Sequence, residues 1–197
     1  MDNEKSAEDY TEKRLNIGCG HKILKDCINV DVTPYAGVDQ VVDLASYPWP
    51  WEDGSIDGIH ASHVIEHLED PVKFINECRR ILKVGGFLRL CLPHSSSCTN
   101  VGCFGHYRTF SYNTMDGYLG RDFYMFGKAP FLTVERKLRW WFEYVDGQGE
   151  LPPGCETVIR AVDWVITGMA NIFPRLWENI ICPTIQMREV IWKGIKL

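Results

Sequence analysis

Residues Leu15–Gly20 read LNIGCG, an apolar run that ends in two glycines separated by one cysteine. The pattern predicts a buried strand followed by a tight turn whose backbone a ligand can approach closely. Two further short β-branched runs follow, and each closes on an acid, Asp31 and Asp43. The first acid can accept hydrogen bonds from ribose hydroxyls, and the second can accept one from an adenine amino group. Together these residues predict a pocket for an adenosine-bearing cofactor.

The rest of the amino-terminal half alternates short apolar runs with turns and one helical segment. Strands are expected at 14–17, 27–31, 40–44, 55–62 and 87–92. A helix is expected before the last of these, because Asp70-Pro71 supplies an N-cap with proline at the first helical position and Gly85-Gly86 supply a stop. The alternation predicts an α/β fold with a parallel sheet. Only about ten residues separate the glycine turn from the second strand, so the first crossover helix is shortened or missing.

The carboxyl-terminal half follows a different pattern. Residues 94–128 are rich in glycine, serine, histidine and aromatic residues, and we expect them to form a lid or substrate loop. The pattern further predicts an exposed strand at 131–142, an amphipathic helix at 158–171 and a last strand at 188–197, with an insertion at 143–183. We expect 14–197 to form a single domain behind a flexible polar tail at 1–13.

Composition narrows the class of protein. The 197 residues carry a net charge of −5 at pH 7, which argues against general nucleic-acid binding. No stretch reaches the roughly 18 apolar residues of a transmembrane helix, so we expect no transmembrane segment. The eight cysteines are scattered and the amino terminus has no signal-peptide pattern, which predicts a reduced, cytoplasmic protein.

The glycine turn also favours one cofactor over another. A dinucleotide-binding turn carries a third glycine that lets the following helix pack closely, and Ile23 occupies that position here. A pyrophosphate also needs a helix N-terminus, for which the short first crossover leaves little room. S-adenosyl-L-methionine (SAM) has no phosphate and needs only the close turn and the two acids. The sequence therefore favours SAM.

Longer stretches resemble a known family. The blocks are LNIGCG (15–20), NVDV (29–32), DL (43–44), SIDGIHASHVIEHLEDP (55–71) and RRILKVGGFLRLCLPH (79–94), in that order. Together they resemble class I SAM-dependent methyltransferases, and in particular the small type 11 methyltransferase-domain branch. The resemblance implies a Rossmann-like sheet, mostly parallel with an antiparallel last strand. It also implies transfer of a methyl group from SAM to an acceptor by direct displacement.

The same resemblance implies cofactor contacts at the glycine turn and at the ends of the second, third and fourth strands. These are Gly18, Cys19 and Gly20 on the methionine side, Asp31 at the ribose hydroxyls with Val32 against adenine, Asp43 at the adenine amino group with Leu44 beside it, and Ser62 and His63 near the sulfonium.

The loop after the fifth strand is expected to cover the methyl-transfer site. His94, Tyr107 and Arg108 are predicted to bind the acceptor, which we expect to be a small molecule or a glycan. His63 and His106 are candidates for the general base, because imidazole takes a proton near neutral pH. Alternatively, His106 and Arg108 only pin the loop by hydrogen bonds. The segment 156–180 offers a peripheral or oligomeric contact.

Two other classes of function stay open as alternatives. One is a domain that binds SAM or its product without catalysis. The other is a zinc hydrolase, because His63, Glu66 and His67 match H-x-x-E-H. A second set of possible zinc ligands is His94, Cys98, Cys103 and His106. The first set directly follows a strand and the spacing of the second matches no known zinc module, so we predict no metal ligand.

Overall fold

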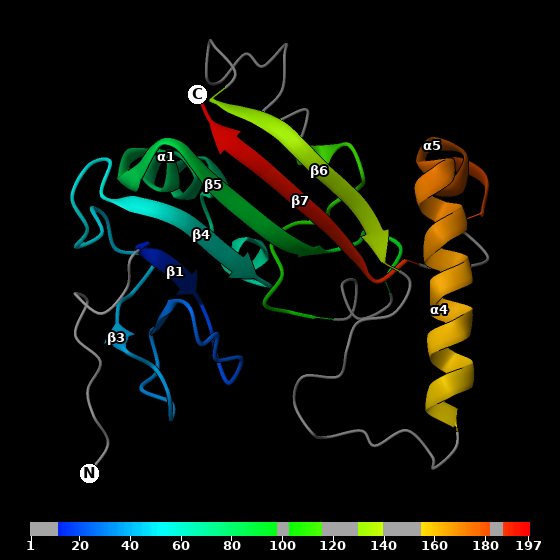
Figure 1. Ribbon diagram of the computed structural model, residues 1–197, viewed down its shortest axis with the longest axis horizontal. Helices are drawn as coiled ribbons and strands as arrows, with labels where there is room; N and C mark the ends of the chain where they lie inside the picture. The colour runs from blue at the N-terminus through cyan, green and yellow to red at the C-terminus, as the bar shows by residue number, and fades with distance from the viewer. Residues whose placement is uncertain (1–11, 98–102, 116–129, 140–154, 182–186) are drawn as a thin grey trace.

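The computed structural model describes residues 12–97, 103–115, 130–139, 155–181 and 187–197. One seven-stranded sheet runs through them in the order β3-β2-β1-β4-β5-β7-β6 (Figure 1). The strands are β1 (Arg14–Ile17), β2 (Ile28–Asp31), β3 (Gln40–Val41), β4 (Ile56–Ser62), β5 (Leu82–Pro93), β6 (Phe131–Arg139) and β7 (Glu189–Lys196). The helical segments are the 3₁₀ turn η2 (Ile65–His67), α1 (Pro71–Ile81), α4 (Cys155–Ile172), α5 (Pro174–Leu176) and the π-helical turn η3 (Trp177–Ile181).

The strand directions confirm the predicted fold. Strand β1 pairs in parallel with β2 and β4, β2 with β3, and β4 with β5. Strand β7 lies antiparallel between β5 and β6. The sheet is therefore mostly parallel with an antiparallel last strand. The parallel strands place their carboxyl ends at one edge, which is where open α/β sheets bind ligands.

The core explains why these segments become strands. Ile17, Ile59 and Leu90 on the central strands β1, β4 and β5 are fully buried, and the strand register places all three on the same face of the sheet. Helix α1 contributes Phe74 and Cys78, both with no exposed side-chain surface. The amino-terminal half of the sequence thus forms the buried centre of the sheet, and the carboxyl-terminal strands β7 and β6 extend the sheet at its β5 edge.

The first crossover contains turns and no helix, as its length predicted. Two buried asparagines hold it instead: Asn16 Nδ2 donates to Asn29 Oδ1 (2.9 Å) and to the Lys22 carbonyl (2.7 Å). The Leu24 amide donates to Asn29 Oδ1 (2.9 Å). These bonds satisfy backbone groups that a helix would otherwise satisfy internally.

Two predicted boundaries were wrong. Strand β3 ends at Val41 rather than Leu44, because Asp43 turns the chain by accepting hydrogen bonds from the Ala45 amide (2.9 Å) and the Ser46 hydroxyl (2.7 Å). Helix α1 ends at Ile81, and β5 already begins at Leu82, so the glycine pair 85–86 lies inside a strand.

The glycine pair marks an irregularity in β5. The register between β4 and β5 shifts between the pairs Ile56–Leu82 and Gly58–Phe87. Gly85 has a φ of 81°, and a Cβ on Gly86 would lie 2.9 Å from the Lys83 carbonyl oxygen. Only glycine fits a backbone that turns this tightly, and such bulges use it regularly.

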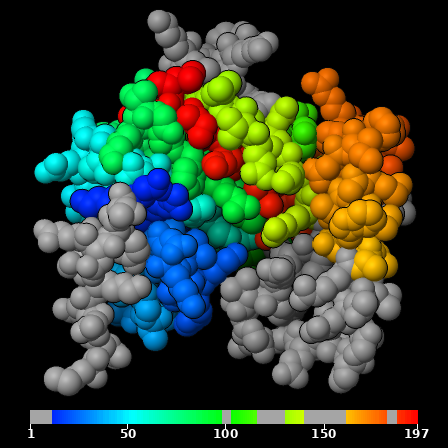
Figure 2. Space-filling model, in the orientation of Figure 1, coloured from blue at the N-terminus to red at the C-terminus, as the bar shows by residue number. Residues whose placement is uncertain are grey.

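The helical segments α4, α5 and η3 stand beside the β6 edge of the sheet and form the orange surface of Figure 2. Asn171 fastens α4 to β6, since its Oδ1 accepts from the Leu138 amide and its Nδ2 donates to the Leu138 carbonyl (both 2.8 Å). Much of the apolar surface of α4 is exposed; Trp164 is 78% exposed. Among the described residues, no helix is long and apolar enough to cross a membrane. Residues 140–142 of the predicted exposed strand and 143–154 of the predicted insertion lie outside the described residues.

Replacing Asp70 should destabilise the fold through helix α1. Its Oδ1 accepts hydrogen bonds from the amides of Val72 and Lys73 (both 3.0 Å), as the predicted N-cap requires. Asp70→Ala should lower the free energy of unfolding by about 1 kcal/mol, whereas Asp70→Ser should cost less because serine also caps. Urea denaturation of the two variants checks this. Equal losses would show that the cap contributes nothing.

Replacing His60 should reduce the loss of stability in acid. His60 lies on β4, and burial together with the charges of Arg89, Arg14 and Lys193 lowers its pKa to about 4. The folded protein then keeps His60 neutral below the unfolded pKa of 6.5, so the unfolded state binds more protons and stability falls with pH. The loss should be about 2 kcal/mol between pH 7 and pH 5.

The matched measurement is urea denaturation of the wild type and His60→Gln at both pH values. The variant should lose correspondingly less stability than the wild type over this interval. Identical pH dependence in the two proteins would contradict the assignment.

Candidate cofactor and acceptor site

The glycine turn follows β1 at the carboxyl edge of the sheet. Gly18 and Gly20 have φ values of 61° and 51°, a region that residues with a Cβ rarely adopt. A Cβ on Gly18 would lie 2.4 Å from Cγ2 of Val64, so the turn packs directly against the segment after β4. Open space surrounds the Cβ position of Gly20. The turn is therefore closed on one side and accessible on the other.

Asp31 links this turn to the end of β2. Its Oδ2 accepts from the Gly20 amide (2.7 Å) and its Oδ1 from the Thr33 amide (3.0 Å). Each carboxylate oxygen keeps further acceptor capacity, so the ribose hydroxyls of an adenosine can still bind. Val32, next along the chain, is 62% exposed and offers an apolar surface to a base. These positions fit the predicted cofactor.

Cys19, between the two glycines, is buried. Its amide donates to the Val30 carbonyl (3.0 Å), which ties the turn to β2. Burial, helped by the negative charge of Asp31, raises the pKa of the Cys19 thiol to about 11. The side chain is thus a neutral thiol that helps to fix the turn.

The third predicted contact, Asp43, lies beyond the end of β3. Hydrogen bonds from Ser46 and Ala45 hold the pKa of its carboxyl below the usual value. Leu44 is 7% exposed and belongs to the core, and its carbonyl accepts from Trp49 Nε1 (3.2 Å). Both Asp43 oxygens thus already stabilise a turn, with acceptor capacity to spare for one adenine amino group.

Ser62 ends β4, and His63 follows it with a φ of 56°, the one described residue other than glycine with a positive φ. The His63 amide donates to the Cys91 carbonyl of β5 (3.0 Å). The ring lies between two acids: Nδ1 is 3.1 Å from Glu66 Oε1, and Nε2 is 3.0 Å from Glu189 Oε1. A strained backbone held this way is typical of functional sites.

The two acids set the charge of His63. Burial lowers the pKa of His63, but hydrogen bonds with Cys91, Glu189 and Glu66 outweigh this effect and raise the pKa to about 12. Although burial raises the pKa of Glu189, its hydrogen bond with His63 brings that pKa below the usual value. The ring is therefore an imidazolium at neutral pH, and both of its nitrogens donate to carboxylates.

The loop after β5 returns over η2. The Tyr107 amide donates to the Glu66 carbonyl (2.8 Å), and Arg108 donates to the carbonyls of Leu68 (2.6 Å) and Glu69. His106 therefore lies beside η2, with its ring centroid 4.7 Å from that of His67. Tyr107 is exposed, whereas Arg108 pins the loop, which was the alternative role predicted for it.

His94 lies apart from this group. Its side chain is 2% exposed, with Nε2 3.0 Å from Glu178 Oε1 of η3 and Nδ1 2.9 Å from Ser96 Oγ. The structure thus places His94 in a buried pair that fastens η3 to the end of β5. Of the predicted lid, 98–102 and 116–128 lie outside the described residues, and Cys98 falls among them.

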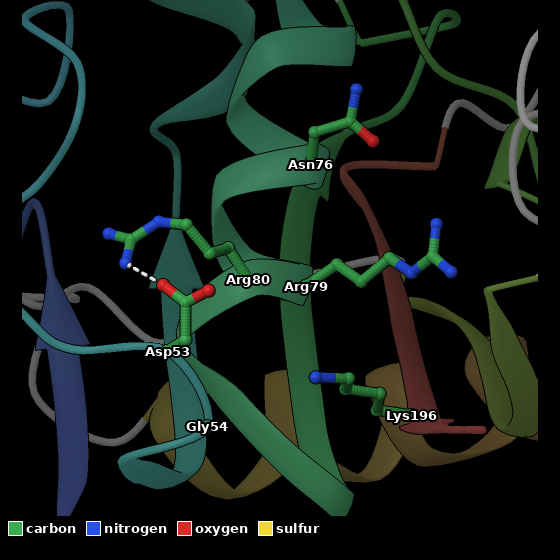
Figure 3. Close-up of a pocket in the computed structure, with 6 residues that line it drawn as sticks. All are labelled: Asp53, Gly54, Asn76, Arg79, Arg80 and Lys196. Atoms are coloured by element: carbon green, nitrogen blue, oxygen red, sulfur yellow. Dashed lines mark hydrogen bonds and ion pairs between the residues drawn. The ribbon is translucent and has the colours of Figure 1, made fainter.

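A pocket of about 540 Å³ opens at the opposite edge of the sheet. Its lining residues are Asp53, Gly54, Asn76, Arg79, Arg80 and Lys196 (Figure 3). Arg80 pairs with Asp53 at 2.6 Å, and Lys196 Nζ donates to the Leu82 carbonyl at 2.6 Å. It contains none of the predicted contacts and lies away from the carboxyl ends of the parallel strands, so it is a separate feature.

Two groups at the site escaped the sequence reasoning. Glu189 begins β7 and meets His63 across 126 positions of sequence, a pairing that no local pattern signals. Glu66 was considered only as part of a zinc motif, yet it is fully buried between His63 and the loop. The apolar pair Val64-Ile65 directly before Glu66 was the available signal for its burial.

Comparisons with known proteins agree with this geometry. Residues 15–90 match the family model described as a methyltransferase domain. A "Probable S-adenosylmethionine-dependent methyltransferase" of Mycobacterium tuberculosis is 40% identical over 52 residues, which are 26% of this chain and only 18% of the length of that protein. The family match thus runs from β1 into β5, and the match to this relative covers little of that protein.

Solved structures extend the likeness to the whole fold. A SAM-dependent methyltransferase from Archaeoglobus fulgidus superposes with a TM-score of 0.58 at 18% identity, covering 94% of this chain and 86% of that one. The YcgJ protein of Bacillus subtilis gives 0.54 at 19% identity, covering 98% and 95%. The chain thus has the fold of these proteins, and its residues 15–90 are similar to a methyltransferase domain.

Proposed function

We propose that this protein is an active SAM-dependent methyltransferase. The observation that carries the proposal is the hydrogen bond that joins the glycine turn to the Asp31 carboxylate. The Asp31 carboxylate holds the Gly20 amide at 2.7 Å and keeps acceptor capacity for a ribose. Bound SAM supplies an activated methyl group, so the chain itself needs only to hold the acceptor in line with it and to exclude water. Such positioning accounts for most of the acceleration in reactions of this kind.

The acceptor atom forms a bond to the methyl carbon as the carbon–sulfur bond breaks, and S-adenosylhomocysteine leaves. Val64 packs against Gly18, so we infer that Ser62 and His63, which directly precede Val64, would border the region of the methyl group. The imidazolium of His63 would act here through its position and charge, because both of its nitrogens already face the carboxylates of Glu66 and Glu189.

We place proton removal from the acceptor at the Glu66–His67–His106 cluster. Both nitrogens of His63 already pair with carboxylates, whereas the ring of His106 lies beside that of His67, four residues after His63. Tyr107 is 61% exposed beside it and would contact the acceptor. We infer a small-molecule or glycan acceptor, because aromatic and polar side chains on a loop suit such ligands.

The test is transfer of a labelled methyl group from SAM to a panel of small-molecule and glycan acceptors. Wild type should transfer label to at least one class of acceptor, and His106→Gln should lower the rate with little effect on cofactor binding. A protein that binds S-adenosylhomocysteine yet transfers label to no acceptor from any cell extract would favour a non-catalytic binding domain.

A further inference from the structure

The structure joins one histidine from each of the two possible zinc sets in the sequence. We propose that Glu66, His67 and His106 form a binding site for a divalent transition-metal ion of the zinc class. One ligand atom from each residue lies within 4.8 Å of the others. This differs from the sequence prediction, which considered each set separately and assigned no metal ligand.

The loop that carries His106 is fixed to the segment that carries the other two ligands. The Tyr107 amide donates to the Glu66 carbonyl, and Arg108 donates to the Leu68 and Glu69 carbonyls. These contacts flank His106 on its carboxyl-terminal side and join sequence positions about 40 residues apart. Hydrogen bonds between the loop and the η2 segment thus hold the three side chains close together.

Glu66 provides the strongest sign that a cation belongs here. Its side chain has no exposed surface. Oε1 has an ion pair with His63 Nδ1 at 3.1 Å, but Oε2 has no partner among the described residues. A buried carboxylate oxygen without a partner is costly, and a metal ion at the cluster would satisfy it.

The hydrogen bond of His67 prepares its ring as a ligand. His67 Nδ1 lies 3.0 Å from the Gly105 carbonyl oxygen, to which it can only donate. Nε2 then carries the lone pair that a metal needs. Histidine ligands in metal sites regularly donate their second nitrogen to a carbonyl in this way. His67 is exposed, which gives an ion access from solvent.

The ligand set indicates the class of metal. Two imidazoles and one carboxylate suit zinc and its neighbours, whereas magnesium and calcium prefer oxygen ligands. Three protein ligands leave a fourth position open, which is typical of catalytic rather than structural zinc. Because Glu66 also pairs with His63, the open position borders the proposed methyl-transfer site. With a metal bound, His106 would be a ligand, and a metal-bound water at the open position would take the acceptor's proton in its place. Metal binding itself can be measured without any acceptor and does not depend on the proposed function.

A neighbouring cluster fits a metal less well. His63, Cys91 and Glu189 also place one ligand atom each within 4.8 Å of the others. However, both ring nitrogens of His63 face carboxylate oxygens at 3.0–3.1 Å, so the ring has no nitrogen left for a metal. The geometry therefore favours the cluster that contains His67 and His106.

The experiment is titration of the chelator-treated full chain with Zn²⁺, in competition with a chromophoric chelator. We expect one equivalent to bind. His67→Gln and His106→Gln should weaken binding by more than the roughly 10- to 100-fold that loss of an outer partner costs. His21→Gln removes an exposed histidine outside the cluster, and Cys103→Ser removes the thiol of the alternative zinc set; both should bind as the wild type does.

Absence of a bound equivalent in the wild type would overturn the proposal. So would wild-type affinity in both cluster variants, or loss of binding in Cys103→Ser. Zn²⁺ should also raise the melting temperature of the wild type but not of His67→Gln, since a ligand that binds only the folded state stabilises it. His67 is exposed, so its variant should fold, and retained S-adenosylhomocysteine binding by that variant would separate loss of metal from loss of the cofactor site.

Discussion

Asp31→Ala is expected to weaken binding of S-adenosylhomocysteine about a hundredfold or more. The variant loses the carboxylate that would accept the ribose hydroxyls, and hydrogen bonds to a charged group contribute about 1.5–3 kcal/mol each. It also loses the bonds from the Gly20 amide (2.7 Å) and the Thr33 amide (3.0 Å), so the glycine turn is no longer held in place. Isothermal titration calorimetry on both proteins measures the change.

Asp26→Ala is the matched control for this prediction. Asp26 is an exposed acid on the same crossover, five residues before Asp31, and it lies outside the glycine turn and the strand end. Its replacement removes the same charge from the same region and should leave cofactor affinity unchanged. If the two variants lost affinity equally, general electrostatics rather than a ribose contact would explain the effect.

Gly18→Ala should both destabilise the fold and abolish cofactor binding. The added Cβ would lie 2.4 Å from Val64 Cγ2, and the φ of 61° is strained for any residue with a Cβ. Overpacking and left-handed backbone together predict a loss of roughly 2–5 kcal/mol in the free energy of unfolding. Relief of the clash would move the turn or the Ser62–Val64 segment, and both belong to the proposed site.

Gly54→Ala measures the cost of backbone strain without a steric clash, and so serves as the control for Gly18→Ala. Gly54 also has a φ of 61°, but nothing lies within 4 Å of its Cβ position and it lines the pocket at the opposite edge of the sheet. This variant should lose only the strain energy, about 1–2 kcal/mol, and should bind S-adenosylhomocysteine normally. Chemical denaturation and calorimetry compare the two. Equal destabilisation would show that Val64 does not enclose the turn.

The parts of the fold that local sequence determines were predictable. Strand β1 matches its predicted bounds, because an apolar run next to a glycine turn has few alternatives. The helix start at Asp70-Pro71 follows from the cap residue itself, and the missing first helix follows from the length of the crossover. Each of these features depends on residues close together in the chain.

The errors in the predicted strand and helix boundaries arose at residue types that are common in two different local structures. A pair of glycines stops a helix or permits a bulge in a strand, and only the pairing of β5 with β4 decides between these at 85–86. Likewise, Asp43 was predicted to close a strand, but its carboxylate forms a turn two residues after β3 has ended.

The site was predictable in part for the same reason. The glycine turn and Asp31 lie where the sequence placed them, at the ends of β1 and β2. The pairing of His63 with Glu189, and the meeting of His67 with His106, depend on contacts between distant strands and loops. Local spacing had instead suggested two separate zinc sets. Only the topology shows which histidines meet.

The central claim is that the turn at 18–20 and Asp31 form a SAM site. The most direct test is calorimetric titration of the folded, chelator-treated full chain with S-adenosylhomocysteine. We predict one site with a dissociation constant in the micromolar range, a free energy of about −8 kcal/mol. A protein that shows a cooperative thermal transition but no heat of binding would contradict the account.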